Sequence, residues 1–144
     1  MVQNKGLIFK EAPTHWPELG KHLVVETRDF DTDQEPPSGG FTAKVHYVSF
    51  DPYQRGRMRN PEKESYSPPF ELDKPITNFG IVSVIKSDNS RFKPGDVVSA
   101  RQTFTEEYTA VPKGMADISE VLKNPYNLDE KEYVNQWTEL LSRP

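Results

Sequence analysis

The residues with the clearest chemical potential lie in one short segment, residues 47–59, with the sequence YVSFDPYQRGRMR. It places a phenol, Tyr53, and two guanidinium groups, Arg55 and Arg57, directly after the turn-forming pair Asp51-Pro52. A phenol can donate a hydrogen bond to a carbonyl oxygen on which negative charge develops. A guanidinium offers a rigid fork of donors to a carboxylate or an enolate. The segment therefore contains groups for proton donation and for anion stabilisation.

The same residues could instead have purely structural roles. Asp51 could cap the turn, Tyr53 could pack, and Arg55, Arg57 and Arg59 could form ion pairs, since buried charges also arise for structural reasons. Both interpretations stay open at this point.

Other polar residues give weaker signals. The three histidines, His15, His22 and His46, are too widely spaced for a metal site, and the chain has no cysteine. The acidic stretch 29–35 lacks the spacing of a calcium loop, and the pair Glu106-Glu107 is expected on the surface. We predict no metal site.

Composition and charge exclude several partners. The 144 residues include 18 basic and 22 acidic side chains, a net charge of -4 scattered along the chain, which is unlike a nucleic-acid-binding surface. The apolar run Leu7–Phe9 is too short for a signal peptide or a membrane span. With no cysteine, the chain fits a reducing compartment. We expect a cytoplasmic protein without nucleic-acid or membrane partners.

Alternating apolar and polar residues predict a mainly β domain around the 47–59 segment. Strands are expected at residues 6–10, 22–28, 41–50, 81–85, 92–100 and 104–111. The first two should pair. In the third, Phe41, Ala43, Val45 and Tyr47 should share one face, and that strand should have one face in the core.

Two loops and a helical tail complete the expected organisation. Residues 29–40 form an acidic, Pro- and Gly-rich loop, and the proline-punctuated residues 60–74 form a candidate binding loop. Helical spacing predicts helices at 118–123 and 128–141, the second with a capping box begun by Asn127. We therefore divide the chain into a barrel domain, residues 1–115, and a helical C-terminal tail, residues 116–144.

The segment 47–59 closely resembles a signature of the zinc-independent medium-chain dehydrogenase/reductase family, in its NADPH-dependent alkenal, enone and prostaglandin reductase branch and particularly its fungal members. Supporting matches occur in the family's order and at about its spacing. They are Gly39-Gly40-Phe41, Lys74-Pro75-Ile76, Phe79-Gly80, Phe92-Lys93-Pro94-Gly95-Asp96-Val97-Val98 and Glu106-Glu107-Tyr108. The resemblance covers residues 5–113 and implies the family's substrate-side domain, a GroES-like, highly twisted, partly open β-barrel.

The resemblance also implies roles for individual residues. The tyrosine of the family's DPY motif lies by the substrate pocket, so we predict that Tyr53 is the catalytic acid or hydrogen-bond donor, with Arg55 or Arg57 stabilising the anion. Asp51, Tyr66, Phe70 and Phe79 are predicted to bind substrate. Where zinc-dependent relatives supply a cysteine ligand, this chain has Asp51-Pro52-Tyr53, which argues against a catalytic zinc.

The sequence contains no G-x-G-x-x-G motif, and the tail is too short for a dinucleotide fold. We therefore expect no bound cofactor and no self-sufficient redox activity. Our first hypothesis is a stand-alone enzyme, derived from an enone reductase, that isomerises, cyclises or dehydrates a small apolar carbonyl compound, as in fungal secondary metabolism. The alternatives are a non-catalytic binding or regulatory module, or a truncated NADPH-dependent oxidoreductase that needs a separate cofactor domain.

Without a second domain, the surface that the family packs against it would face water, and large apolar patches are rarely left exposed. We expect the helix at 127–141, with Tyr133 and Trp137, to cover this surface or to form a homodimer contact.

Overall fold

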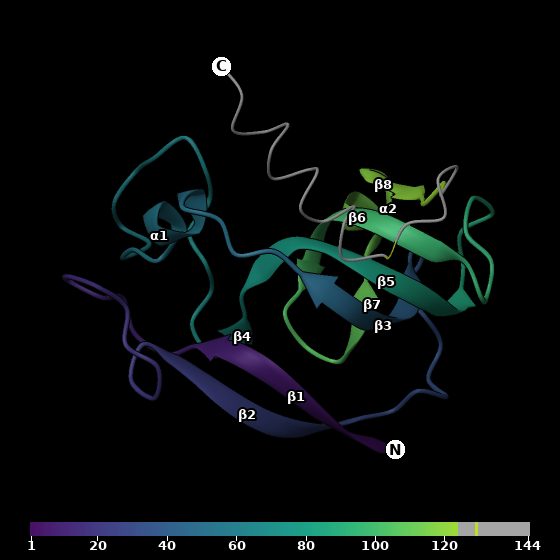
Figure 1. Ribbon diagram of the computed structural model, residues 1–144, viewed down its shortest axis with the longest axis horizontal. Helices are drawn as coiled ribbons and strands as arrows, with labels where there is room; N and C mark the ends of the chain where they lie inside the picture. The colour runs from purple at the N-terminus through teal and green to yellow at the C-terminus, as the bar shows by residue number, and fades with distance from the viewer. Residues whose placement is uncertain (124–128, 130–144) are drawn as a thin grey trace.

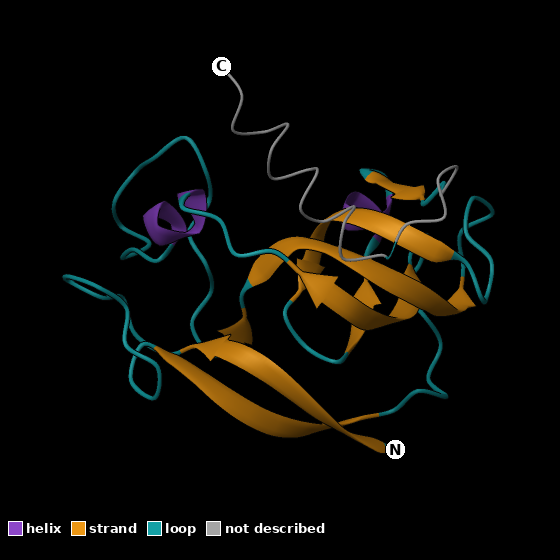
Figure 2. Ribbon diagram, viewed as in Figure 1, coloured by secondary structure: helices purple, strands orange, loops and turns teal. Residues whose placement is uncertain are grey.

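The computed structural model describes residues 1–123 and Asp129. Within them the chain is mainly β, as predicted (Figure 2). The strands are β1 Val2–Phe9, β2 Leu23–Phe30, β3 Phe41–Val48, β4 Lys74–Pro75, β5 Thr77–Ser87, β6 Val97–Phe104, β7 Tyr108–Val111 and β8 Ser119–Val121; the helices are α1 Tyr53–Arg57 and α2 Lys113–Ala116. Neither helix of this described part has the length and apolar character that a membrane crossing requires.

The strands form two sheets, with the smaller one along the bottom of Figure 1. The smaller sheet has the order β2-β1-β4 and the larger one the order β7-β3-β5-β6-β8. β1 and β2 pair antiparallel over their whole length, from Val2 opposite Phe30 to Phe9 opposite Leu23, which confirms the predicted pairing.

The segment between β6 and β7 connects the two sheets. The amide of Leu7 donates to the carbonyl of Thr105 at 2.8 Å, and the amide of Glu107 donates to the carbonyl of Lys5 at 2.9 Å. The strand predicted at 104–111 is confirmed for residues 108–111, which form β7, but residues 105–107 leave the large sheet to pair with β1. The sheets do not close completely, and the result is the partly open, GroES-like barrel that the resemblance implied.

β3 shows how a bulge changes the face that a side chain occupies. Phe41 and Ala43 are buried as expected, but Tyr47 is 40% exposed. The register between β3 and β5 shifts between Thr42 and Ala43 and again between Val45 and Tyr47. A one-residue shift moves the following side chains to the other face, so alternation read from the sequence fails beyond the bulge.

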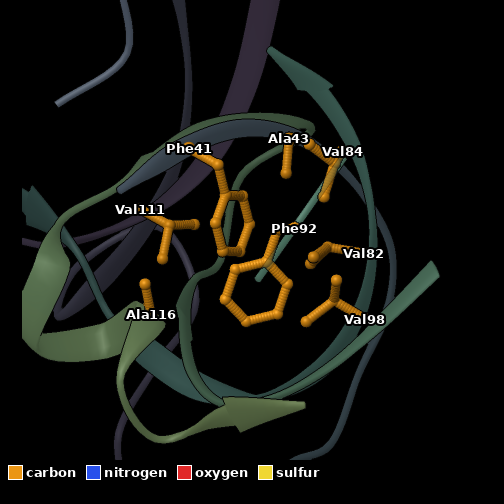
Figure 3. Close-up of a cluster of buried hydrophobic side chains, with 8 residues drawn as sticks. All are labelled: Phe41, Ala43, Val82, Val84, Phe92, Val98, Val111 and Ala116. Carbon is orange, nitrogen blue, oxygen red and sulfur yellow. The ribbon is translucent and has the colours of Figure 1, made fainter. Parts of the chain in front are cut away.

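The main core lies inside the large sheet (Figure 3). The rings of Phe41 and Phe92 are 4.9 Å apart between centroids and tilted by 50°, with aliphatic side chains of β5, β6 and β7 around them. Gly40 begins this packing, because a Cβ at that position would lie 2.0 Å from the carbonyl oxygen of Val111. A second cluster, formed by Phe9, Leu23, Met58, Phe70 and Ile76, anchors the end of α1 on the small sheet.

The C-terminal region differs from the prediction. Residues 119–121 form β8, which pairs antiparallel with β6, with Ser119 opposite Ala100 and Val121 opposite Val98. The helix predicted at 118–123 is therefore wrong. A helix this short is marginal in isolation, whereas the edge of β6 offers unpaired backbone groups. The helix predicted at 127–141 lies outside the described residues except for Asp129, and both this helix and the predicted division of the chain between residues 115 and 116 stay predictions.

Candidate functional site

The turn that follows β3 is fixed by side chains before α1 begins. The hydroxyl of Ser49 donates to Oδ2 of Asp51 at 2.8 Å, and the amide of Asp51 donates to Oε1 of Gln54 at 2.8 Å. Nε2 of Gln54, which is almost fully buried, donates in turn to the carbonyl of Thr77 at the start of β5. Gln54 therefore ties the first turn of α1 to the large sheet.

Asn78 of β5 fixes the same turn by a second hydrogen bond. It is fully buried, and its Nδ2 donates to the carbonyl of Ser49 at 2.6 Å. Its Oδ1 accepts a hydrogen bond from the hydroxyl of Thr105. Neither Gln54 nor Asn78 is identified in the sequence analysis. The available signal is Asn78 itself: an asparagine beside the apolar strand residues must be hydrogen-bonded if it is buried, and so indicates a polar contact in the core.

Tyr53 begins α1 and is 43% exposed. Burial raises the pKa of its phenol above the ordinary value, the negative charge of Asp51 raises it further, and the positive charge of Arg57 opposes this effect. A phenol with a raised pKa stays protonated throughout the neutral range. Tyr53 therefore presents a hydrogen-bond donor near the surface, on a turn that is fixed from two sides.

Arg55 is engaged with the loop before β2 rather than with a carboxylate. Its Nη2 donates to the carbonyls of His15 at 2.7 Å and Pro13 at 3.3 Å, and its Nε donates to His15 at 3.2 Å. These contacts position the loop that carries the exposed Trp16. They support a structural role for Arg55, and its predicted catalytic role stays a prediction without a contact that favours it.

Arg57 is almost buried, with 9% of its surface exposed. Its Nε donates to the carbonyl of Pro68 at 2.9 Å, its Nη1 donates to the hydroxyl of Thr77 at 2.8 Å, and its guanidinium lies 4.3 Å from the centre of the Phe70 ring. Burial lowers the pKa of Arg57 from its ordinary value, although a guanidinium remains charged at any physiological pH.

Arg59 completes the set of arginine contacts. Its guanidinium donates to the carbonyls of Gly56, Lys63 and Ser67. Arg57 and Arg59 thus hold the loop predicted at 60–74 as a binding loop through its backbone carbonyls, and Tyr66 lies on this loop with 94% of its surface exposed. Among the described residues, none of the three arginines makes an ion pair, so the ion pairs of the structural interpretation are replaced by bonds to carbonyls.

The structure brings only some of the predicted site residues together. Asp51, Tyr53 and Arg57 interact electrostatically around α1, and Phe70 contacts Arg57. Phe79 packs with Ile81 in the core and is only 4% exposed, while Tyr66 projects into solvent. The substrate-binding roles of Asp51, Phe79, Phe70 and Tyr66 stay predictions.

The histidines and the acidic pair have ordinary contacts. Nδ1 of His22 accepts from the amide of Glu18 at 2.9 Å, and Nε2 of His46 lies 3.0 Å from the hydroxyl of Ser83. Within residues 1–123 no three histidines or carboxylates gather as metal ligands. Glu106 is less exposed than predicted: burial raises the pKa of its carboxyl, although Asn4 donates to it at 3.2 Å.

The fold and the α1 segment together define a substrate-side barrel domain of the medium-chain dehydrogenase/reductase class. Residues 5–118 match the family described as the N-terminal domain of oxidoreductase, and the chain belongs to that family.

Sequence relatives agree with this assignment. The chain is 43% identical over 129 residues to an NADP-dependent oxidoreductase, RED1, of Cochliobolus heterostrophus. This alignment covers 90% of this chain and 36% of the relative. The chain is 35% identical over 112 residues to an NADP(+)-dependent 2-alkenal reductase of Nicotiana tabacum, in an alignment that covers 76% of this chain and 31% of the relative.

A solved structure agrees in fold. CurA from Vibrio vulnificus in complex with NADPH superposes with a TM-score of 0.70 at 21% identity, covering 90% of this chain and 35% of CurA. The chain thus spans only about a third of the length of these relatives.

Proposed function

We propose that this chain is the substrate-binding domain of an NADP-dependent reductase that acts on carbonyl-conjugated double bonds. The observation that carries the proposal is Tyr53, a protonated phenol that is exposed on a turn fixed by Gln54 and Asn78. The names of the relatives, an NADP-dependent oxidoreductase and a 2-alkenal reductase, supply the reaction class.

The described residues do not fit a dinucleotide. Their helices have five and four residues, the pairs between named strands are all antiparallel, and no Gly-rich turn leads from a parallel strand into a helix. The proposal therefore assigns the cofactor to a separate dinucleotide-binding domain. NADPH held there would supply the reducing equivalent.

The chain's own residues would bind and polarise the substrate. Oη of Tyr53 would donate a hydrogen bond to the substrate carbonyl, whose oxygen gains negative charge as the conjugated double bond is reduced. Arg57, which interacts electrostatically with Tyr53, adds positive potential beside that oxygen. Because Gln54 and Asn78 fix the turn, little reorganisation is needed when the charge develops.

The test is a fusion of this chain to the dinucleotide-binding portion of the RED1 relative, assayed by NADPH oxidation with a 2-alkenal. We expect Tyr53→Phe to lower kcat by about 100-fold with a small change in KM, as for the loss of one oxyanion donor. Tyr108→Phe is the matched control, because Tyr108 stacks on Phe30 away from α1. An unchanged kcat in Tyr53→Phe would overturn the proposal.

A second candidate is cofactor-independent proton transfer, for which a protonated Tyr53 beside Arg57 is also suited. The chain alone, without NADPH, would then convert a β,γ-enone to its conjugated isomer, as followed by NMR, and Tyr53→Phe would abolish turnover. No isomerisation by the chain alone would eliminate this candidate and leave the reductase proposal standing. A small apolar carbonyl ligand, a homodimer contact through residues 127–141 and a cytoplasmic location stay predictions.

A further inference from the structure

A cleft of about 290 Å³ opens next to Arg57, between the loop that ends at β4 and the end of β6. Its size is close to the lower end of the range for small-molecule sites. Arg57 and Phe70 line it, whereas Tyr53, Tyr66 and Phe79 do not, so the cleft includes only part of the site that the sequence predicted.

The guanidinium of Arg57 carries an unbalanced positive charge into this cleft. Among the described residues it makes no ion pair, and its Nε and Nη1 are used by Pro68 and Thr77. Nη2 of Arg57 has no protein acceptor in that part of the chain. The described side-chain atoms that are both fully enclosed and unpaired are three threonine hydroxyls, and Nη2 is not one of them. A nearly buried cation with a spare donor is suited to an anion, because burying a charge is costly unless the charge is paired.

The other lining residues suit an anionic group on an apolar body. Lys74, at the mouth, adds a second positive charge, and Gln102 adds an amide. The rings of Phe70 and Phe104 provide apolar walls. Glu71 also lines the cleft and is exposed, as Lys74 is, so solvent screens both of these charges and the nearly buried Arg57 carries the dominant charge of the cleft.

We propose that this cleft is a subsite for a carboxylate at the end of an apolar chain, with Arg57 and Lys74 as its recognition groups. The position of Arg57 connects the subsite to the proposed function: Tyr53 and Arg57 are four residues apart on α1, so they lie on one face of the helix, about one turn apart. Under the proposed function, the preferred substrates are therefore carbonyl compounds that also carry a carboxylate.

The test uses the full chain and three probes: octanoate, its neutral methyl ester and inorganic phosphate. Binding is followed by amide chemical shifts, which should change around Phe70, Thr77 and Phe104. We expect octanoate to bind at least about tenfold more tightly than the ester, the effect of a hydrogen bond to a charged group. Binding of phosphate at the same residues with equal affinity would instead assign the subsite to a phosphate group and overturn the carboxylate assignment.

Variants separate recognition from folding. Arg57→Met removes packing as well as charge, so the decisive change is at the exposed Lys74. Lys74→Gln should weaken octanoate binding about two- to fivefold, as expected for one exposed charge, and Lys74→Glu should weaken it further. Lys93→Gln is the matched control, because Lys93 is an exposed cation outside the cleft.

Equal affinity for octanoate and its ester, shift changes elsewhere, or an equal loss in Lys93→Gln would each overturn the subsite. Tyr53→Phe should leave octanoate binding unchanged. Failure of the subsite is thereby distinguishable from failure of the proposed function, which depends on Tyr53 in the fusion assay.

Discussion

The core around Phe41 and the segment around α1 are held together by different forces. In the core, apolar side chains from four strands and the loop before β6 pack around two phenylalanine rings. Around α1, five residues of helix are fixed by hydrogen bonds from Gln54, Asn78 and the arginines to backbone carbonyls far away in sequence. The barrel is therefore stabilised by packing, while the candidate site is positioned by directional polar contacts.

The core and the α1 segment therefore tolerate different amounts of sequence change. Packing energy depends on volume, so a core position tolerates few substitutions. Where arginine side chains donate hydrogen bonds to the backbone carbonyls of a loop, the position of the loop does not depend on the side chains that the loop itself carries. The arginines of α1 thus fix the walls of the site, while exposed residues such as Tyr66 stay free to vary.

The largest expected effect is in the core. Phe41→Ala should lower the free energy of unfolding by about 3–5 kcal/mol, because it removes a fully buried ring and leaves a cavity against Phe92. Urea denaturation followed by circular dichroism measures the change. Phe50→Ala is the control: this ring is 65% exposed just before α1, and its loss should change stability by no more than about 0.5 kcal/mol. Equal losses at the two positions would contradict the comparison.

The core strands could be predicted from the sequence because apolar residues alternate with polar ones along β3. There Phe41 and Ala43 alternate with Thr42 and Lys44, although Thr42 is buried as well, and the Pro-Gly-Asp turn locates the start of β6 at Val97. Prediction failed where tertiary pairing overrides local pattern. Residues 119–121 join the edge of β6 as a strand, and nothing in six residues of helical spacing reveals that edge.

The sequence indicates which residue types could form the candidate site, but it does not indicate their contacts. Tyr53 stands out because of its motif, and its exposed, protonated phenol is compatible with the expected role. The partners of Arg55 could not be predicted, because its acceptors are the backbone carbonyls of His15 and Pro13. Every residue has a backbone carbonyl, so the residue type does not identify the acceptor. Gln54 and Asn78 act through partners 23 and 29 residues away, which only the fold brings together.

A smaller effect is expected when the arginine contacts are removed. Arg55→Gln should lower stability by about 1 kcal/mol and accelerate amide hydrogen exchange at residues 13–18, because the carbonyls of Pro13 and His15 lose their donors. Mass-spectrometric hydrogen exchange provides the measurement. Lys21→Gln, an exposed cation at the end of the same loop, should leave the exchange unchanged. If Arg55→Gln left it unchanged too, Arg55 would have no positioning role, and its predicted catalytic role would gain weight.

The smallest expected effect is a pH dependence that separates arginine contacts from ordinary ion pairs. On the small sheet, Lys10 lies 2.5 Å from Glu26 and 2.7 Å from Asp73, where the loop 60–74 ends. Hydrogen bonds from Lys10 and then Arg28 lower the pKa of Glu26, while Asp73 and then Glu26 raise the pKa of Lys10.

The sign of the pH dependence follows from these directions. The contribution of Glu26 is fully present above the ordinary carboxyl pKa of about 4.3 and is lost as pH falls through its lowered value, whereas that of Lys10 is lost only at strongly basic pH. Glu26→Gln should therefore reduce the fall in stability below about pH 4, as measured by urea denaturation at several pH values. The contacts of Arg55 involve no carboxylate, so Arg55→Gln should shift the whole stability curve without changing its slope in that range. If Arg55→Gln changed how steeply the free energy of unfolding falls with pH below about pH 4, a carboxylate would take part in holding α1. That result would contradict the carbonyl contacts that distinguish this segment from the rest of the barrel.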